Sequence, residues 1–320
     1  MKKILIIGVS GSLGKGVVKE IKAEYEVTGT YASQPFSMDG IKTQRLDVTV
    51  RSDFDSLAKD FDAVFLVAGA MPAMMKGYSP QQYIDVNITG VMNVLEYCRM
   101  NAIPKLIYIM TFSDASGSFY TGVPIKDDGA RTLTLAGDHA VYSVSKVAAC
   151  DLIEHYHQEY GLQTIIFRIP TVYCNDENFN YYVDGTLKTK AYIQMIGSII
   201  NDKTIQVWGN PRNAKDMPYI KDFARLVSKA VEHETAQGVF NAGTGNPITL
   251  EELVTVMVEV FSPEKKIEKI YLSEKPSQPN FTFDMEKTRK TFGYRASWSC
   301  QEMFEDIKKT INIEKLSVTN

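Results

Sequence analysis

A tyrosine and a lysine four residues apart, Tyr142 and Lys146, are the first candidates for chemistry, in the run Tyr142-Ser143-Val144-Ser145-Lys146. In a helix this spacing places both side chains on one face. A neighbouring ammonium favours the phenolate and lowers the phenol's pKa from its usual value of about 10. Such a phenol can give or take a proton while a substrate hydroxyl becomes a carbonyl. The pair is a candidate acid–base site, and the alternative is a partly exposed tyrosine beside an unrelated lysine.

The first residues of the chain form a second candidate site. The apolar run Ile4 to Ile7 predicts a buried strand, and three glycines follow it at the spacing G-x-x-G-x-x-G: Gly8, Gly11 and Gly14. A helix that starts in a glycine turn leaves its first amides unpaired, and an anion such as a pyrophosphate can bind there. At the first strand of an α/β chain this pattern predicts a dinucleotide site. The alternative is a tight turn without a ligand.

Strands and helices alternate over the first 170 residues. Besides the first strand and helix, we expect strands at 26–31, 41–48, 63–68, 105–110 and 163–168, and helices at 52–60, 79–101 and 142–160. This order predicts an α/β fold with a doubly wound parallel (Rossmann) sheet. Ligands bind outside the carboxyl ends of such strands, so one crevice should collect Gly8, Asp47, Ala68 and Thr111.

Beyond Pro170 the pattern predicts a smaller C-terminal α+β substrate lobe. We expect a polar, aromatic-rich loop at 175–184, helices at 188–200, 222–232 and 250–261 and after residues 284 and 299, and strands at 205–208, 239–242 and 267–272. The predicted domains are a dinucleotide-binding Rossmann domain, 1–170, and a mainly substrate-binding lobe, 171–320, with segments near 216–245 returning to the Rossmann sheet.

Composition excludes several classes of function. The chain has 320 residues, 44% of them hydrophobic, and a formal net charge of -3, which disfavours a nucleic-acid or membrane-surface partner. No apolar run reaches the length of a membrane span, and Met1 leads into a strand without a cleavage site, so we expect a cytoplasmic protein. The 4 cysteines lie far apart, which favours reduced thiols, and the 4 histidines form no metal motif, so no metal is expected.

The chain resembles the extended short-chain dehydrogenases/reductases, the NAD-dependent epimerase/dehydratase family, which act mostly on nucleotide-linked sugars. The resemblance covers nearly the full length. It rests on GVSGSLG at 8–14, LDV at 46–48, FLVAG at 65–69, NITGVMNVL at 87–95, YSVSK at 142–146, RIPTVY at 168–173, VWG at 207–209, KDMPYIKD at 215–222 and NAGTG at 241–245. Together these segments are specific for the family, though not for one reaction.

The resemblance implies transient oxidation or reduction at a sugar carbon. Tyr142 would be the acid–base group, and Lys146 would hold the cofactor ribose and lower the pKa of the tyrosine. A hydroxyl at the end of the fifth strand, Thr111 or alternatively Ser113, would hydrogen-bond the reacting oxygen. Substrate contacts would come from Thr171, Asn175, Lys215 and Tyr219.

The resemblance and the strand ends together give a set of cofactor-binding residues. They are Gly8, Ser10, Gly11, Ser12, Leu13, Gly14, Ser33, Asp47, Val48, Val67, Ala68, Gly69, Asn87, Tyr142, Lys146, Pro170 and Val172. The cofactor is NAD or NADP. The second strand end, 28–33, has no acidic residue for the ribose 2′-hydroxyl of NAD, and Ser33 could bond a 2′-phosphate, so the sequence leans slightly toward NADP.

The predicted function is that of an NAD(P)-dependent epimerase or reductase acting on a nucleotide-linked sugar. Dehydration is disfavoured, because Thr111-Phe112-Ser113-Asp114 lacks the glutamate expected of a dehydratase. Lys215 stands where the family usually has an arginine, and Cys174 where it has a glycine. The long loop between Thr111 and Tyr142 is either a lid or an insertion.

Two expectations rest on analogy with the family. The alternative function is that of a non-catalytic NAD(P)-binding sensor or scaffold, although such relatives typically lose the tyrosine or the lysine and this chain keeps both. A homodimer through the helices at 79–101 and 142–160 is expected by analogy alone.

Overall fold

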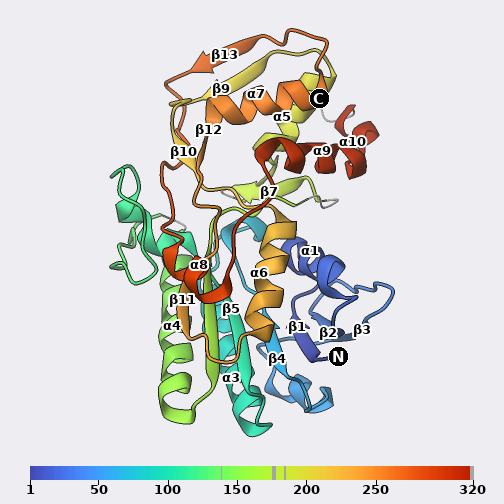
Figure 1. The fold of residues 1–320 in the computed structure, drawn as a ribbon, viewed down its shortest axis with the longest axis vertical. Coiled ribbons are helices and arrows are strands. Elements are labelled where there is room, and N and C mark those ends of the chain that lie inside the picture. The colour runs from blue at the N-terminus through green and yellow to red at the C-terminus, as the bar shows by residue number, and fades with distance from the viewer. Residues whose placement is uncertain (138, 175–177, 184, 318–320) are drawn as a thin grey trace.

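A computed structural model describes residues 1–137, 139–174, 178–183 and 185–317. Within these residues a seven-stranded parallel sheet forms the centre, with helices on both faces and a smaller lobe at its carboxyl edge (Figure 1). In spatial order the strands are β11 (Gly238–Asn241), β6 (Gln163–Ile169), β5 (Lys105–Thr111), β4 (Ala63–Leu66), β1 (Lys3–Ile7), β2 (Glu26–Tyr31) and β3 (Lys42–Arg45). The predicted doubly wound Rossmann sheet is confirmed.

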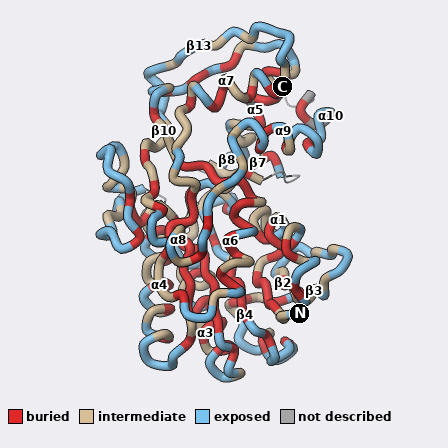
Figure 2. The backbone as a smooth tube through the Cα atoms, viewed as in Figure 1, coloured by how far each residue is buried: buried red, intermediate tan, exposed pale blue. Residues whose placement is uncertain are grey.

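Side chains of the sheet alternate between two apolar cores. From β1, Ile4 and Ile6 pack into one core with α1 (Ser12–Ile21) and α6 (Ile220–Glu232). Leu5 and Ile7 pack into the other core, with α3 (Gly90–Met100) and α4 (His139–Tyr160). Figure 2 shows the central strands as buried. Because helices cover both faces, the strands are continuous apolar runs rather than alternating ones.

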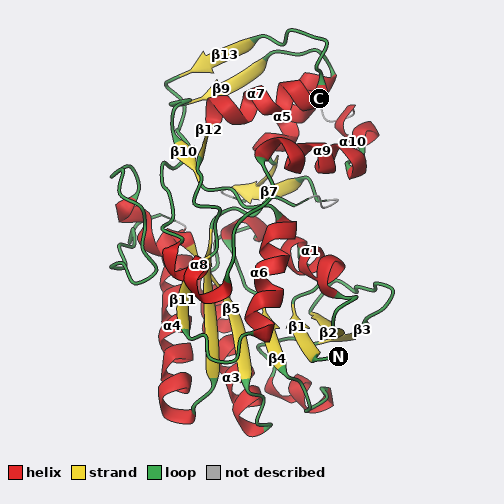
Figure 3. Cartoon of the chain, in the orientation of Figure 1, coloured by secondary structure: helices red, strands yellow, loops and turns green. Residues whose placement is uncertain are grey.

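The chain enters the C-terminal lobe and then returns to the sheet. β11 pairs with β6, and α6 packs on α1, so both lie with the first 170 residues rather than with the lobe. α8 (Glu286–Phe292) packs against β11 and α6 and also lies with the sheet, and two 3-10 helices, Pro72–Met74 and Phe112–Ser118, follow β4 and β5. The elements of the lobe, coloured by type in Figure 3, are β7 (Asn180–Val183), β8 (Thr186–Thr189), α5 (Ala191–Ile200), β9 (Ile205–Trp208), β10 (Ala214–Lys215), β12 (Ile248–Thr249), α7 (Leu250–Phe261), β13 (Lys269–Leu272), α9 (Cys300–Thr310) and α10 (Ile313–Ser317).

Three predicted elements differ from the structure. The helix expected at 79–101 is interrupted: α2 (Pro80–Ile84) and α3 are joined by a π-helical turn, Asp85–Thr89. The helix expected at 52–60 is a short 3-10 helix, Arg51–Ser56. The loop expected at 175–184 contains β7, which pairs with β8 in a hairpin whose turn includes Gly185 at φ +72°.

Candidate active site

The glycine turn combines two glycines required by packing with one that is not. A methyl group on Gly8 would lie 2.7 Å from the Ala68 nitrogen, and Gly8 has a positive φ of 103°. A methyl group on Gly14 would lie 2.9 Å from the Val9 Cα. At Gly11 the nearest atom would be 3.6 Å away, and Gly11 begins α1 without a side-chain cap. The first backbone N–H groups of α1 therefore have no capping side chain, and the glycine before them has free space around it, as an anion site requires.

The other predicted residues of the turn lie where the sequence placed them. Ser10, Ser12 and Leu13 are partly buried between the end of β1 and the first turn of α1. The backbone nitrogens of Val67 and Ala68 donate to the carbonyl oxygen of Ile7 at 3.0 and 2.8 Å. The segment that follows β4 is thereby held against the glycine turn.

The predicted residues beyond β2 and β3 lie at the carboxyl ends of these strands. Ser33 is exposed, two residues after β2. Asp47 uses its Oδ1 to accept the Thr49 backbone N–H at 3.0 Å and the Thr49 hydroxyl at 2.7 Å. Val48 is buried, and its carbonyl oxygen accepts a hydrogen bond from Asn93 at 2.8 Å. Asp47 and Val48 thus stabilise the turn after β3 through their own contacts.

Asn87 connects the end of β4 to the helix that carries the tyrosine and lysine. Its Oδ1 accepts the Ala70 N–H at 2.8 Å, and its Nδ2 donates to the Ala70 carbonyl at 2.9 Å and to the Ser145 hydroxyl at 3.0 Å. Asn87 lies in the π-helical turn, which accounts for the interruption of the predicted helix. Such turns often occur at functional sites, because the extra residue redirects a side chain.

The structure brings Tyr142 and Thr111 together. Tyr142 lies in the first turn of α4, half-buried, and Thr111 ends β5 and is 5% exposed. Burial raises the pKa of the Tyr142 phenol, and a side-chain hydrogen bond with Thr111 lowers it. The predicted lowering of this pKa by Lys146 is not found, because Lys146 is not among the groups that shift it. Burial outweighs the hydrogen bond with Thr111, so the pKa of Tyr142 is raised overall.

Ser113, the alternative to Thr111, is the next hydroxyl along the chain. Its backbone N–H donates to the Thr111 Oγ1 at 3.1 Å, and the two hydroxyl oxygens are also 3.1 Å apart. The hydrogen bond to the Tyr142 phenol is thus made by Thr111, and Ser113 contacts Thr111.

Lys146 is a buried cation next to the crevice. It is 6% exposed, and its Nζ lies 4.1 Å from the centroid of the Tyr108 ring. A methyl group on Gly69, which follows β4, would lie 3.8 Å from this Nζ. Among the residues that the structure describes, none forms a hydrogen bond or an ion pair with the ammonium. Burial lowers the pKa of Lys146 to about 8.

The predicted residues beyond β6 differ in their burial. Pro170 is buried, Val172 is partly buried and Thr171 is exposed. The next residue, Tyr173, fixes this segment, because its N–H donates to the Pro218 carbonyl at 2.9 Å. Asn175 lies outside the described residues.

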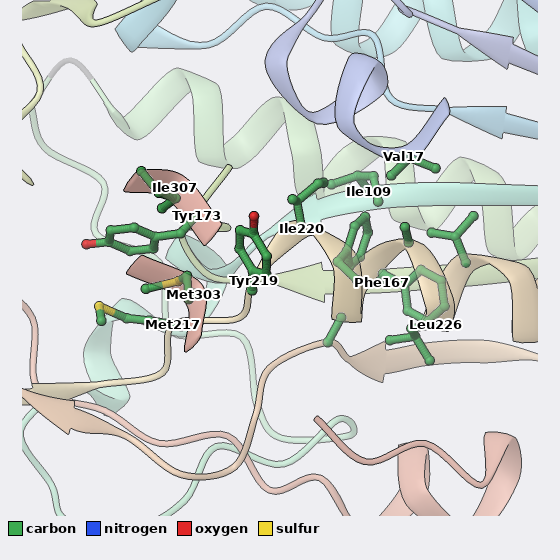
Figure 4. Close-up of a cluster of buried hydrophobic side chains, with 14 of the residues drawn as sticks. Val17, Ile109, Phe167, Tyr173, Met217, Tyr219, Ile220, Leu226, Met303 and Ile307 are labelled. Carbon is green, nitrogen blue, oxygen red and sulfur yellow. The ribbon is translucent and has the colours of Figure 1, made fainter. Parts of the chain in front are cut away.

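The two remaining substrate candidates, Lys215 and Tyr219, have different environments. Lys215 in β10 is half-buried, and burial lowers its pKa. Tyr219 is 4% exposed and donates to an Asp306 carboxylate oxygen at 2.7 Å. Figure 4 shows its ring within the cluster that contains Tyr173 and Ile307. With its ring in the core and its hydroxyl engaged by Asp306, Tyr219 has a structural role here, and we omit it from the proposed site.

Sequence reasoning missed a buried polar network at the carboxyl ends of β5, β6 and β11. It consists of Asp114, Arg168, Asn241 and Asp127, each less than 9% exposed. One signal was present in the sequence: Arg168 interrupts the apolar strand Gln163–Ile169, and a buried arginine requires a carboxylate or carbonyl partner. Its partner, 54 positions away, is not specified by local sequence.

The described residues offer neither a metal site nor a membrane-spanning helix. Within the described ranges, no group of three or more histidine, cysteine, aspartate or glutamate side chains is placed to hold a metal ion. In the same part of the chain, no helix combines the length and apolar character that a membrane span needs.

Comparison with known proteins agrees with the geometry. A UDP-glucuronate 4-epimerase of Thermodesulfobacterium geofontis is 26% identical over 98% of this chain and 96% of its own. Among solved structures, a UDP-N-acetylglucosamine 4-epimerase of Bacillus cereus matches with a TM-score of 0.79 and 19% identity, covering 98% of both chains. A UDP-glucuronic acid 4-epimerase of Bacillus cereus, in complex with UDP-glucuronic acid and NAD, has a TM-score of 0.77 and 21% identity, covering 98% of this chain and 99% of that one.

The family comparison covers most of the chain. Residues 4–243, from the first strand through the glycine turn and the tyrosine–lysine pair to the end of β11, match the NAD dependent epimerase/dehydratase family. The chain therefore belongs to the NAD-dependent epimerase/dehydratase family.

Proposed function

We propose that this protein is an NAD(P)-dependent enzyme that oxidises or reduces a carbon of a nucleotide-linked sugar, as an epimerase or a reductase. The observation that carries the proposal is the hydrogen-bonded pair Tyr142 and Thr111, beside a buried Lys146 that no described residue pairs with. A buried ammonium without acceptors is costly, so its position favours a ligand that supplies them.

The residues present fit a dinucleotide. Gly11 leaves the start of α1 accessible to a pyrophosphate, and Lys146, whose Nζ lies near Gly69, would donate to the ribose hydroxyls. When bound, the nicotinamide accepts or returns a hydride. Tyr142 would hold or release the proton of the reacting hydroxyl at its phenol oxygen, and Thr111 would donate a hydrogen bond to the same substrate oxygen.

A nucleotide-linked substrate is favoured by Lys215 and by the relatives. Lys215 places a half-buried ammonium in the lobe, where one phosphate oxygen of a diphosphate can pair with it. The relatives described above are named as enzymes of UDP-sugars. Thermal-shift measurement with UDP-, GDP-, dTDP- and CDP-linked sugars identifies the nucleotide, and substitution of Lys215 by Ala should weaken that shift without affecting cofactor binding.

The form of the cofactor is a separate part of the proposal. The end of β2 lacks an acidic residue, and Ser33 is exposed there, so we expect NADP(H) to be accepted as well as NAD(H). Competition binding of the two forms measures the preference. An epimerase should consume no added cofactor, whereas a reductase should oxidise NADPH in proportion to product.

The decisive test is Tyr142→Phe. Loss of the phenol proton should lower turnover by about 10²–10⁴-fold, while cofactor affinity changes by no more than a few-fold. Tyr156→Phe is the matched control, because Tyr156 lies on the same helix and its hydroxyl bonds Glu96 at 2.6 Å instead. Full turnover in Tyr142→Phe would end the proposed mechanism, and cofactor binding without turnover of any sugar nucleotide would favour the non-catalytic alternative.

A further inference from the structure

The long loop between β5 and α4 is attached to the sheet by a buried ion pair. Asp114 lies three residues after Thr111 and has no exposed surface, and Arg168 of β6 is 3% exposed. The pairing is bidentate: the Arg168 Nε lies 3.0 Å from Oδ1 of Asp114, and the Nη2 lies 2.8 Å from Oδ2. The ion pair thus holds this part of the loop on the sheet, whereas a lid has to move freely.

The other donors of Arg168 are also occupied. Its Nη1 donates to the Lys126 carbonyl at 2.9 Å and to the Asn241 Oδ1 at 3.1 Å. The Asn241 Nδ2 donates to the Ile125 carbonyl at 2.8 Å. The guanidinium therefore joins the carboxyl ends of β6 and β11 to two separate stretches of the loop, and its donors are committed to protein acceptors.

The same turn is connected to the Thr111 side chain by a hydrogen bond from the backbone. The Ser113 N–H donates to the Thr111 Oγ1 at 3.1 Å, directly before Asp114. On the other side, the Thr132 N–H donates to the Asp114 carbonyl at 2.7 Å, and the Gly117 N–H donates to the Thr132 carbonyl at 2.8 Å. A displacement of the Asp114 side chain would thus be transmitted to the Thr111 hydroxyl through one short turn.

Stability alone is a poor explanation for this pair. Removing both charges from water costs about as much as their attraction returns, and an apolar pair of similar volume is often at least as stable. A planar guanidinium facing a carboxylate does fix the relative orientation of the two groups.

We propose that Asp114 is a positioning residue, which through Arg168 holds the Thr111 hydroxyl against the Tyr142 phenol. This inference rests on the roles proposed above for Thr111 and Tyr142. It assigns the first part of the long loop to the support of the reacting groups, rather than to closure over the substrate.

The Tyr142 phenol reports whether Thr111 is in place. The hydrogen bond from Thr111 lowers the phenol's pKa, so its loss should raise that pKa. Two other titratable rings pack on Tyr142: Tyr83, with 6.0 Å between ring centroids, and His139, with 6.5 Å. Lys146 lies one turn further along α4. The Asp114 variant leaves all three of these groups in place, so they serve as a constant background.

The test is Asp114→Asn, with Asp151→Asn as the matched control. The asparagine keeps the shape of the aspartate, but it turns an N–H toward the guanidinium and loses one of the two bonds. Asp151 pairs with Arg131 of the same loop at 2.6 Å, on the exposed surface. We expect turnover to fall about 10–100-fold in Asp114→Asn, with cofactor affinity within a few-fold of the wild type, and no change above about twofold in Asp151→Asn.

A second readout needs no turnover. A fluorotyrosine at position 142, whose pKa is lowered by the fluorine, can be titrated by fluorine NMR in the folded protein. We expect Asp114→Asn and Thr111→Val each to raise this pKa, and the double variant to raise it no further than Thr111→Val alone. Additive effects, or an unchanged titration in Asp114→Asn, would overturn the positioning role.

A further variant keeps the proposal testable if Asp114→Asn does not fold. Asp114→Leu combined with Arg168→Met removes both charges together and leaves neither unpaired. It should fold and show the titration of Thr111→Val, whereas a wild-type titration would refute the proposal. If no sugar nucleotide is turned over by the wild type but the titration shifts as expected, the positioning role holds and the proposed function fails.

Discussion

Two buried lysines at opposite edges of the sheet have different surroundings. Lys105, the first residue of β5, donates to the carbonyl oxygens of Ala230, Val231 and His233 at 3.0, 2.5 and 2.8 Å. These carbonyls end α6, where the helix dipole favours a cation. Lys146, at the carboxyl edge, has the face of Tyr108 beside it and no hydrogen bond to any part of the chain that the structure describes.

The difference separates a lysine that is satisfied by the chain from one that we propose binds a ligand. All three donors of an ammonium can be satisfied inside a protein, as Lys105 shows, so burial by itself does not explain the isolation of Lys146. The isolation fits an edge of the sheet where the glycine turn, Gly69 and Tyr142 also converge. Both side chains are about equally buried, at 6% exposure, so the contrast lies in their acceptors.

The largest expected effect comes from Lys146→Met. Turnover should fall about 10²-fold or more, because the proposed contact with the cofactor ribose is lost. Stability should not fall, since the variant removes a buried cation without hydrogen-bonded partners. Steady-state kinetics, cofactor titration and thermal unfolding of the same sample check this. A destabilised variant with normal turnover would place Lys146 in the structural class with Lys105.

Lys105→Met should produce the opposite result. The carbonyl oxygens of Ala230, Val231 and His233 lose this donor, which should lower the free energy of unfolding by about 1–3 kcal/mol. Lys2 still donates to Val231 and Gln163 to His233, so the Ala230 carbonyl loses most. Turnover and cofactor affinity should remain at wild-type values, because Lys105 and the end of α6 lie at the edge of the sheet opposite to the candidate site. Denaturant unfolding alongside kinetics measures both. A loss of activity at full stability would contradict the assignment of a purely structural role to Lys105.

A further effect, which leaves turnover aside, is a pH dependence of stability that belongs to Lys146. Its pKa is about 8 in the folded protein and 10.5 in the unfolded chain, so the unfolded chain binds more protons between these values. The free energy of unfolding of the wild type should therefore rise with pH across this window, relative to Lys146→Met. At neutral pH the variant should be more stable by up to about 3 kcal/mol. Chemical denaturation at several pH values from neutral to 10 measures this, and a constant difference would show that the cation is satisfied in the folded state.

Much of the fold follows from the sequence because the relevant signals are local. The apolar runs of β1, β4, β5 and β6 predict strands buried on both faces, and the glycine spacing predicts the turn after β1. The interruption of the helix at Asp85–Thr89 was not predictable in this way, because it depends on the contacts of Asn87 with Ala70 and Ser145. Periodicity does not register a single extra residue in a helical turn.

In the candidate site, too, some features follow from local sequence and others depend on the whole fold. The spacing of Tyr142 and Lys146 predicts a shared helix face, and counting along β5 predicts Thr111. The pKa of Tyr142 moves in the direction opposite to the predicted one, because burial depends on the whole fold. Tyr219 was expected at the substrate, and its side chain packs in the core with Asp306 as its partner.

The sequence by itself determined most of the order of strands and helices along the chain, the glycine turn and the residue types of the candidate site. These depend on backbone sterics and on neighbours within a few positions. The tertiary structure alone decided which buried charges have partners: three carbonyls for Lys105, a carboxylate 54 positions away for Arg168, and no described group for Lys146. Desolvation and hydrogen-bond geometry depend on residues distant in the chain, and these set how each ionisable group behaves.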